Sequence, residues 1–111
     1  MALPNSDKAY IPSQKLKGYL LSEAHGVGRS KAKFFRSLGF DESNVALFEQ
    51  NLLEIARTGT MVEIVTTQHG KKYVVDGTLE APGGRTVTIR TIWIIEIDTD
   101  EPRFVTAYPS G

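Results

Sequence analysis

The chain has no cysteine, only two histidines and no long apolar run, and each shortage removes a class of protein. Without cysteine there are no disulfides, no thiolate zinc sites and no cysteine nucleophile. The longest apolar runs, such as Ile92–Ile95, are far shorter than the roughly 18–20 residues that a membrane helix needs. Met1–Ser6 has neither the charged nor the apolar region of a signal peptide. We therefore expect a cytoplasmic protein without a membrane anchor.

The length of 111 residues allows one hydrophobic core and leaves no room for two independent ones. The sequence has no internal repeat and no low-complexity linker that would separate two units. We therefore expect a single domain over residues 1–111, with a helical part at 1–57 and a sheet at 58–111.

The chain also lacks net charge, because 13 lysines and arginines balance 13 acids. The charges are segregated, however. Between Lys15 and Arg36 six basic residues accompany one acid, and between Asp41 and Glu54 four acids accompany no base. A basic segment can attract an anionic partner even on a neutral protein, because steering depends on the local potential. The alternative is a pair of solvated helix faces of opposite sign.

Helix signals fill residues 1–57. Side chains that can cap helix N-termini precede three apolar stripes. The third stripe consists of Val45, Phe48, Leu52 and Ile55. The candidate N-caps are Ser13, Ser30, and either Asp41 or Ser43. Gly39 is suited to the C′ position that closes the second helix, and Gly59 ends the third.

From Thr60 the apolar period changes to two, which predicts four strands. The strands are Met61–Thr67, 71–79 with an irregularity at Asp76-Gly77, Arg85–Ile97 and Arg103–Tyr108. In the last strand, Phe104, Thr106 and Tyr108 are expected to share one face. The predicted fold class is α+β, with N-terminal helices packed on a four-stranded antiparallel β-meander.

Metal and cofactor chemistry has little support in the sequence. His25 and His69 are 44 positions apart, and neither has a carboxylate at a helical ligand spacing. Asp98–Glu101 lacks the glycine and the spaced ligands of a calcium loop, so a plain acidic turn explains it better. Residues 26–31 are too few for a phosphate-binding P-loop. We expect no metal and no cofactor.

The segment His25–Lys31 places an imidazole, a guanidinium and an ammonium at the start of a predicted helix. Helix N-terminal amides favour phosphate, basic side chains add positive charge, and histidine can move protons near neutral pH. These groups suit a phosphodiester substrate. The alternative is an exposed loop without a binding role.

Arg90 lies in the middle of an otherwise apolar strand, where an unpaired charge would be costly. It must face solvent, a carboxylate or an anionic ligand. Pairing with Asp76 or Glu96 is the structural explanation. Thr106 and Tyr108 add hydroxyl groups near the end of the chain, although a strand threonine can be purely structural.

Several motifs, taken as a set, resemble a small uncharacterised domain family of bacteria and phages. They are Leu3-Pro4-Asn5, Lys15-Leu16 with Tyr19-Leu20-Leu21, His25 with Gly28 and Ser30–Phe35, Gly39-Phe40, Arg90–Trp93 and Val105–Pro109. The layout of helices followed by a four-stranded antiparallel sheet is similar to the barnase, EndoU, colicin and RelE-like group of ribonucleases, many of which are toxins.

Members of that group cleave RNA without a metal, with the 2′-hydroxyl as nucleophile. The resemblance implies that His25 is a general base or acid and that Lys31 and Arg90 stabilise the phosphate and the transition state. It also implies that Thr106 or Tyr108 is a positioning hydroxyl. The chain departs from better-known members in having no clear second acid–base group, a role that Lys31 or Tyr108 would have to fill.

The expected function is therefore a metal-independent endoribonuclease of toxin type, with RNA as substrate and a small antitoxin or immunity protein as partner. The expected RNA-binding residues are Arg29, Ser30, Lys33 and Arg36. Three alternatives stay open: an inactive member of the group, a non-catalytic module that binds protein or RNA, and a structural domain that dimerises through its oppositely charged helices.

Overall fold

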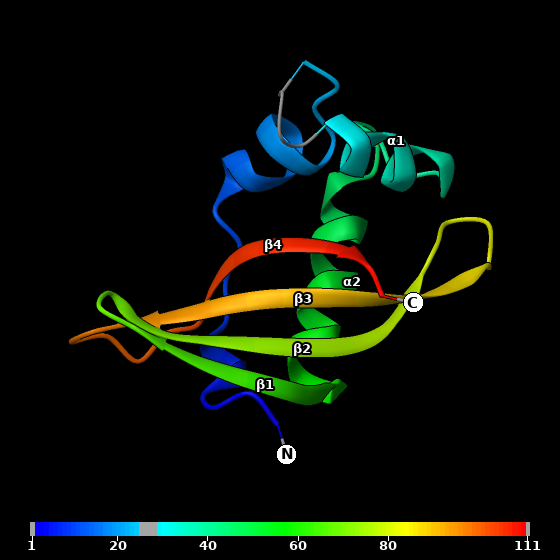
Figure 1. Cartoon of the computed structure of the whole chain (residues 1–111). Helices are drawn as coiled ribbons and strands as arrows, with labels where there is room; N and C mark the ends of the chain where they lie inside the picture. The colour runs from blue at the N-terminus through cyan, green and yellow to red at the C-terminus, as the bar shows by residue number, and fades with distance from the viewer. Residues whose placement is uncertain (1, 25–28, 111) are drawn as a thin grey trace.

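The computed structural model of the chain describes residues 2–24 and 29–110. Helical segments are followed by an antiparallel sheet with the strand order β1-β2-β3-β4 (Figure 1). The elements are the 3₁₀-helices η1 (Ser6–Lys8) and η2 (Ser13–Lys15), the π-helix η3 (Leu16–Leu20), the α-helices α1 (Arg29–Ser37) and α2 (Val45–Thr58), and the strands β1 (Thr60–Thr67), β2 (Gly70–Glu80), β3 (Thr86–Glu96) and β4 (Arg103–Pro109). The predicted α+β class, with helices on a β-meander, is confirmed.

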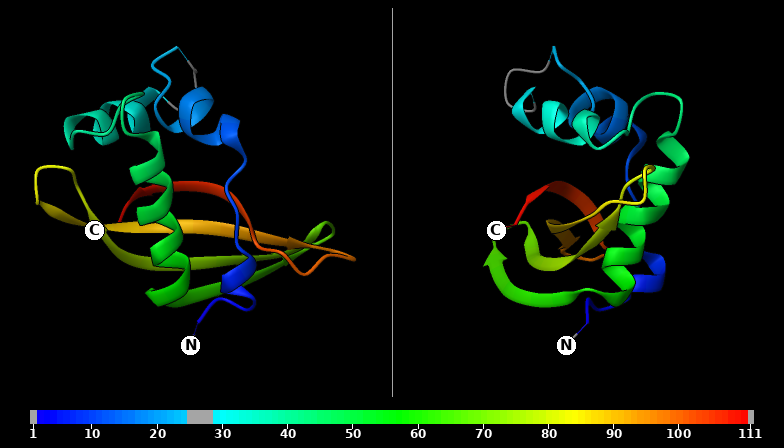
Figure 2. Two further views of the ribbon diagram at one scale, coloured as in Figure 1. Left: turned by 180° about the vertical axis from the view of Figure 1, so that it is seen from behind. Right: turned by 90° about the vertical axis from the view of Figure 1, so that its right-hand side faces the viewer.

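The core lies between α2 and one face of the sheet. Seen from behind, α2 runs across the strands, and the N-terminal segment descends beside it (Figure 2). Phe48, Leu52 and Ile55 form the predicted apolar stripe of α2, and at most 1% of each is exposed. The short helix α1 and the π-helix η3 lie beside the β4 edge of the sheet (Figure 1). None of the helices in residues 2–24 and 29–110 has the length and hydrophobicity that a bilayer crossing needs.

The first predicted helix forms as two short helices, η2 and η3, neither of which is an α-helix. Pro12 stands at the N-cap of η2, so Ser13 lies inside the turn and is not the N-cap. The Leu21 N–H donates to the Leu16 carbonyl at 2.8 Å, one residue further back than in an α-helix. This wider turn brings Leu16, Leu20 and Leu21 to one side, and all three are buried.

The second helix ends as predicted but begins earlier. Arg29 is already helical, so Ser30 lies within α1 and not at its N-cap. Gly39 adopts a left-handed φ of 105°. Its N–H donates to the Arg36 carbonyl at 3.0 Å, and the Phe40 N–H donates to the Phe35 carbonyl at 3.2 Å. These two bonds form a Schellman motif, which explains why glycine stands at this position.

The third helix begins at an N-cap that the sequence prediction missed. The N-cap of α2 is Asn44, whereas the prediction named Asp41 or Ser43. The Asp41 carboxylate accepts bonds from the N–H and the hydroxyl of Ser43. The Asn44 side chain accepts from the Asp41 N–H at 2.8 Å and donates to the Gly39 carbonyl at 2.9 Å. Hydrogen bonds from the side chains of Asp41 and Asn44 therefore stabilise the turn before α2, and the N-cap side chain makes no capping bond to the helix.

The predicted irregularity at Asp76-Gly77 is also wrong. The pairing of β2 with β3 is unbroken there, with Asp76 opposite Arg90 and Gly77 opposite Ile89. Gly77 instead allows close approach of α2, because a Cβ at this position would lie 2.7 Å from Cγ2 of Ile55. The glycine thus marks helix–sheet packing and not a bulge.

Gly77→Ala is expected to lower the free energy of unfolding by about 1–3 kcal/mol, because the added methyl group forces Ile55 out of its packed position. The measurement is urea unfolding followed by circular dichroism. Gly83→Ala is the matched control, since nothing lies within 4 Å of a Cβ there. Equal stability of the two variants would contradict the close packing of α2 on β2.

A one-residue bulge interrupts the pairing of β4 with β3. Trp93 lies opposite Phe104, whereas the preceding residue Ile92 lies opposite Thr106. Val105 is therefore an extra residue in β4. A single extra residue reverses which side chains face the core beyond it.

The bulge corrects the expectation that Phe104, Thr106 and Tyr108 share one face. Phe104 is fully buried in the core, while Thr106 and Tyr108 are half-buried on the opposite face. Tyr108 lies opposite Arg90 in the pairing with β3. The bulge thus places both predicted hydroxyl groups on the same sheet face as Arg90.

The N-terminal segment is tied to the beginning of β4. The Tyr10 N–H donates to the Pro102 carbonyl, and the Phe104 N–H donates to the Tyr10 carbonyl, each at 3.0 Å. These bonds make Tyr10 a parallel bridge partner of Arg103. Residues at the start of the chain therefore cover part of the β4 edge.

Candidate functional site

Four side chains from three elements meet at the β4 edge. The hydroxyl groups of Tyr19 in η3 and Thr106 in β4 share a hydrogen bond of 3.1 Å. The Lys31 ammonium in α1 donates to the Tyr19 hydroxyl at 2.9 Å. Lys31 also lies 6.0 Å from the centre of the Tyr108 ring. We call Tyr19, Lys31, Thr106 and Tyr108 the Tyr19 cluster; all four are half-buried.

Positive charge surrounds the Tyr19 ring. The Lys31 Nζ lies 5.4 Å and the Lys15 Nζ 5.1 Å from the ring centre. Lys15 precedes Tyr19 by four residues in the same helical segment, so the local fold brings the two together. Cations at this distance from an aromatic ring are attracted to its face. The ring and the hydroxyl of Tyr19 are thus both in contact with lysine.

These contacts change the acidity of Tyr19. Partial burial alone would raise the pKa of its hydroxyl. The hydrogen bonds from Lys31 and Thr106, together with the charges of Lys31 and Lys15, outweigh burial and lower the pKa below the ordinary 10.0. The phenolate form is therefore more accessible than in a free tyrosine, and Lys31 is placed to stabilise it.

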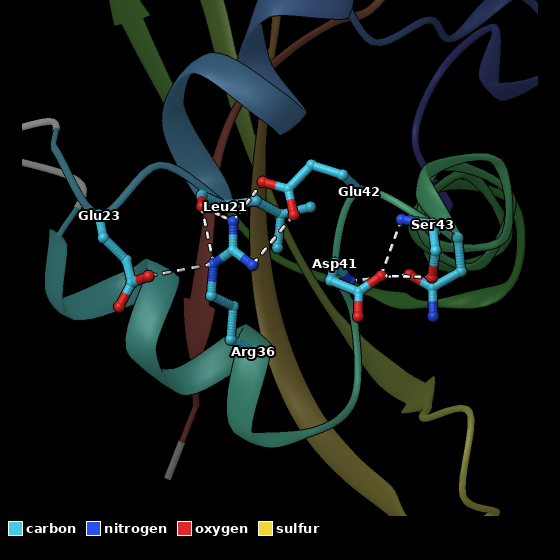
Figure 3. Close-up of polar contacts among 7 residues, drawn as sticks. Leu21, Glu23, Arg36, Asp41, Glu42 and Ser43 are labelled. Atoms are coloured by element: carbon cyan, nitrogen blue, oxygen red, sulfur yellow. Dashed lines mark hydrogen bonds and ion pairs between the residues drawn. The ribbon is translucent and has the colours of Figure 1, made fainter.

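Packing of α1 holds Lys31 in place. The next residue, Ala32, and Phe35 are fully buried, so this side of α1 is fixed on the core. Hydrogen bonds of Arg36 also hold the end of the helix in place. Its guanidinium donates to the Leu21 carbonyl at 3.0 and 2.6 Å and to the Glu42 carboxylate. Figure 3 shows Arg36 between these partners and Glu23.

The structure brings together three of the five expected catalytic residues. Lys31, Thr106 and Tyr108 belong to the Tyr19 cluster, whereas His25 lies outside the described residues. Sequence reasoning missed Tyr19 as a site residue. Its only sequence signal is a place within the family-like motif Tyr19-Leu20-Leu21, where a tyrosine beside two leucines is easily interpreted as core.

Arg90 pairs with Asp76, one of the two carboxylates predicted as its structural partner. It donates to both carboxylate oxygens of Asp76, at 2.8 and 2.9 Å. Glu96, the other considered partner, instead pairs with Arg103 at 3.2 Å. Asp76, and to a smaller extent Tyr108, raise the pKa of Arg90 above its usual range. The Arg90 side chain still keeps 38% exposure, beside the Tyr19 cluster on the same sheet face.

Asp76→Asn is expected to lower stability at neutral pH and to make no difference in strong acid. The hydrogen bond from Arg90 lowers the pKa of the Asp76 carboxyl below the ordinary 3.8. A lowered pKa in the folded state contributes stability above the unfolded pKa, and this contribution disappears as the pH falls through the folded pKa. The free energies of unfolding of wild type and variant should therefore become equal only below the pKa of Asp76 in the folded state, which lies below 3.8. Asp98→Asn, at an exposed position, serves as the control. A difference in the free energy of unfolding between wild type and Asp76→Asn that persists in acid would contradict the ion pair.

The expected RNA-binding residues fall into two groups. Arg29, Ser30 and Lys33 are exposed along α1, the helix that carries Lys31. Arg36 is engaged with Leu21 and Glu42, so a phosphate would have to displace these partners. The exposed basic surface therefore lies at the beginning of α1.

An open hollow lies on another part of the surface. This hollow of about 620 Å³ lies between the first helical segments and the start of α2, lined by Ile11, Ser13, Gln14, Leu16, Lys17, Val45, Ala46 and Glu49. It includes no member of the Tyr19 cluster. Within residues 2–24 and 29–110, no three histidine, aspartate or glutamate side chains are grouped closely enough to hold a metal ion.

Comparisons with known proteins show a family and a solved structure with a similar fold. The model of a family described as a domain of unknown function, DUF6883, matches residues 2–111. A similar fold occurs in the solved structure of a contact-dependent growth inhibition toxin–immunity protein complex from Klebsiella pneumoniae 342. That chain is 17% identical, with a TM-score of 0.73, and the match covers 96% of this chain and 97% of that one. At this identity the likeness shows the fold alone. No curated protein matches the chain in sequence.

Proposed function

Since the chain belongs to the DUF6883 family of domains of unknown function, we propose its function from the chemistry of the Tyr19 cluster. The proposal is a metal-independent endoribonuclease of toxin type that cleaves RNA through its 2′-hydroxyl. The observation that carries it is the contact of Lys31 and Thr106 with one tyrosine hydroxyl of lowered pKa. Perturbed ionisable groups held together in this way are a feature of catalytic sites.

The proposed reaction needs one group that accepts a proton and one that donates a proton. The Tyr19 phenolate accepts the proton of the 2′-hydroxyl, and the 2′-oxygen forms a bond to phosphorus. The bond from phosphorus to the 5′-oxygen breaks, and this oxygen receives a proton. The products are a 2′,3′-cyclic phosphate and a free 5′-hydroxyl. Lys31 stabilises the negative charge that builds on the phosphate oxygens.

The remaining expected residues have supporting roles in this proposal. His25 gives its proton to the leaving 5′-oxygen. Thr106 orients the Tyr19 hydroxyl through their shared hydrogen bond, and Arg90 contacts the phosphate with the exposed part of its guanidinium. The hydroxyl of Tyr108 lies on the same face as Arg90 and positions the same phosphate.

Binding of the rest of the RNA is assigned to α1. Arg29, Ser30 and Lys33 are exposed and lie on the helix that presents Lys31 to the cluster. Contacts of this kind hold the phosphate backbone without reading its sequence. In this proposal the chain acts on RNA in the cytoplasm as a single domain.

The fold likeness supports the toxin type and a protein partner. The similar solved structure is described as a toxin–immunity protein complex, and a small immunity protein is the corresponding partner proposed here. Because that description names both a toxin and an immunity protein, it also favours a second candidate function. In this second candidate the chain is a non-catalytic interaction module that binds a protein or RNA.

The test is incubation of the purified protein with total RNA in EDTA, with His25→Ala as the control variant. Cleavage by the wild type, with 2′,3′-cyclic phosphate ends, is the expected result. RNA that carries 2′-O-methyl groups should stay intact, because its nucleophile is blocked. Intact RNA over a wide range of protein concentrations would overturn the ribonuclease proposal. Salt-dependent RNA binding without cleavage would support the interaction module.

A further inference from the structure

The strand β1 forms an open edge of the sheet, on the side opposite to the Tyr19 cluster (Figure 1). Within the described residues it pairs only with β2. The edge at β4, by contrast, is partly covered by Tyr10. An open edge presents backbone N–H and C=O groups that can pair with another strand, and proteins usually protect it with charges, proline or bulges. A bulge at Val62 interrupts the pairing near the start of β1, and the regular part of the strand beyond it carries a single charged residue, Glu63.

Three side chains of β1 are both apolar and exposed. Val62, Ile64 and Val65 are exposed to 47%, 46% and 39%. A shallow hollow of about 310 Å³ beside them is lined by Met61, Val62, Glu63 and Ile64. Strand addition uses both features, because backbone bonds supply affinity and hollows accept alternate side chains.

We propose that β1 pairs antiparallel with β1 of a second copy, so that two four-stranded sheets join into one. The twofold axis passes beside Ile64, which then lies opposite Ile64 of the other copy. In this register Glu63 lies opposite Val65 of the other copy. Two identical antiparallel strands close the assembly, because each pairs with the open β1 edge of its mate.

Complementary charges favour this register, and they favour a second copy of the chain as the partner of β1. Val65 pairs with Lys72 of β2, and the two side chains share a sheet face. Glu63 of one copy, Val65 of the other and Lys72 of the other therefore lie in one row. Glu63 and Lys72 are two strand spacings apart, roughly 10 Å between backbones, which their long side chains can span. A register centred on Glu63 would instead bring two carboxylates face to face.

The pairing leaves the Tyr19 cluster uncovered in both copies. The cluster lies at the β4 edge, and the proposed contact uses only the β1 edge. Dimer formation and RNA cleavage are therefore independent, and failure of either proposal leaves the other standing.

Sedimentation velocity from micromolar to millimolar protein concentration tests the pairing. The wild type should change from monomer to dimer as the concentration rises. Ile64→Lys should remain monomeric at every concentration, since it places two ammonium groups opposite each other. Ile97→Lys is the matched control, because Ile97 is 62% exposed and lies outside β1. A wild type that stays monomeric throughout would overturn the proposal, and so would equal loss of dimer in the control.

A charge exchange tests the register. Glu63→Lys should weaken the dimer about tenfold, because the pair with Lys72 of the other copy becomes repulsive. Adding Lys72→Glu to the same chain should restore the affinity. A double variant that remains as weak as Glu63→Lys alone would overturn the register centred on Ile64. Circular dichroism of each variant confirms that the fold is kept.

Discussion

Lys31→Met is expected to slow RNA cleavage by about 10²–10⁴-fold, the usual range for loss of an acid–base or charge-stabilising group. Methionine keeps the length of the side chain and removes the ammonium. The variant therefore loses the 2.9 Å hydrogen bond to Tyr19 and the positive charge beside the proposed phosphate. The pKa of Tyr19 should rise toward its ordinary value, because Lys31 is among the causes that lower it.

The measurement is the single-turnover rate of cleavage of a short RNA as a function of pH. The wild-type rate should rise with pH as Tyr19 loses its proton, and in Lys31→Met this rise should move to higher pH. Lys33→Met is the matched control, since Lys33 is exposed on the same helix and is not among the lysines that lower the pKa of Tyr19. It should weaken binding and leave the rate of bound RNA unchanged. Full activity of Lys31→Met would remove the Tyr19 cluster from the mechanism.

Phe48→Ala is expected to lower the free energy of unfolding by about 3–5 kcal/mol, a loss typical of a buried phenylalanine. Phe48 of α2 is fully buried. Its ring stacks on Phe40 with 4.4 Å between centres and lies 5.0 Å from the Phe35 ring of α1. It therefore joins both α-helices and the turn between them in one aromatic contact.

Urea unfolding followed by tryptophan fluorescence measures this effect, because Trp93 is the single tryptophan and lies in the core. Leu47→Ala is the control: Leu47 is the preceding residue and is 40% exposed, so its loss should cost less than 1 kcal/mol. A Phe48→Ala variant as stable as the control would show that α1 is held by other contacts.

Local patterns in the sequence were sufficient to predict most of the fold. The change of apolar period near Thr60 predicts the strands, and the stripe with Phe48, Leu52 and Ile55 predicts α2. Gly39 ends α1 as expected, because a left-handed residue at C′ is a local requirement.

The misses have a common physical cause. The π-helix at Leu16–Leu20, the bulge at Val105 and the role of Gly77 all depend on what each segment packs against, and packing is not encoded in local periodicity. The same holds for the candidate site. Lys31 was identified from its local chemistry, and Thr106 and Tyr108 from the resemblance to a family of ribonucleases. The hydroxyl that contacts Lys31 and Thr106 belongs to Tyr19, a residue for which the sequence alone predicts no role.

The contact between Tyr19 and Thr106 joins residues 87 positions apart, so it determines when during synthesis a complete site can exist. A growing chain that has formed α1 and α2 holds Tyr19 and Lys31 but has no Thr106 until β4 has been made. Pairing of such distant segments is also a slow step in folding. Under the proposed function, a chain interrupted before β4 is therefore expected to lack ribonuclease activity, which should appear only once β4 has been added.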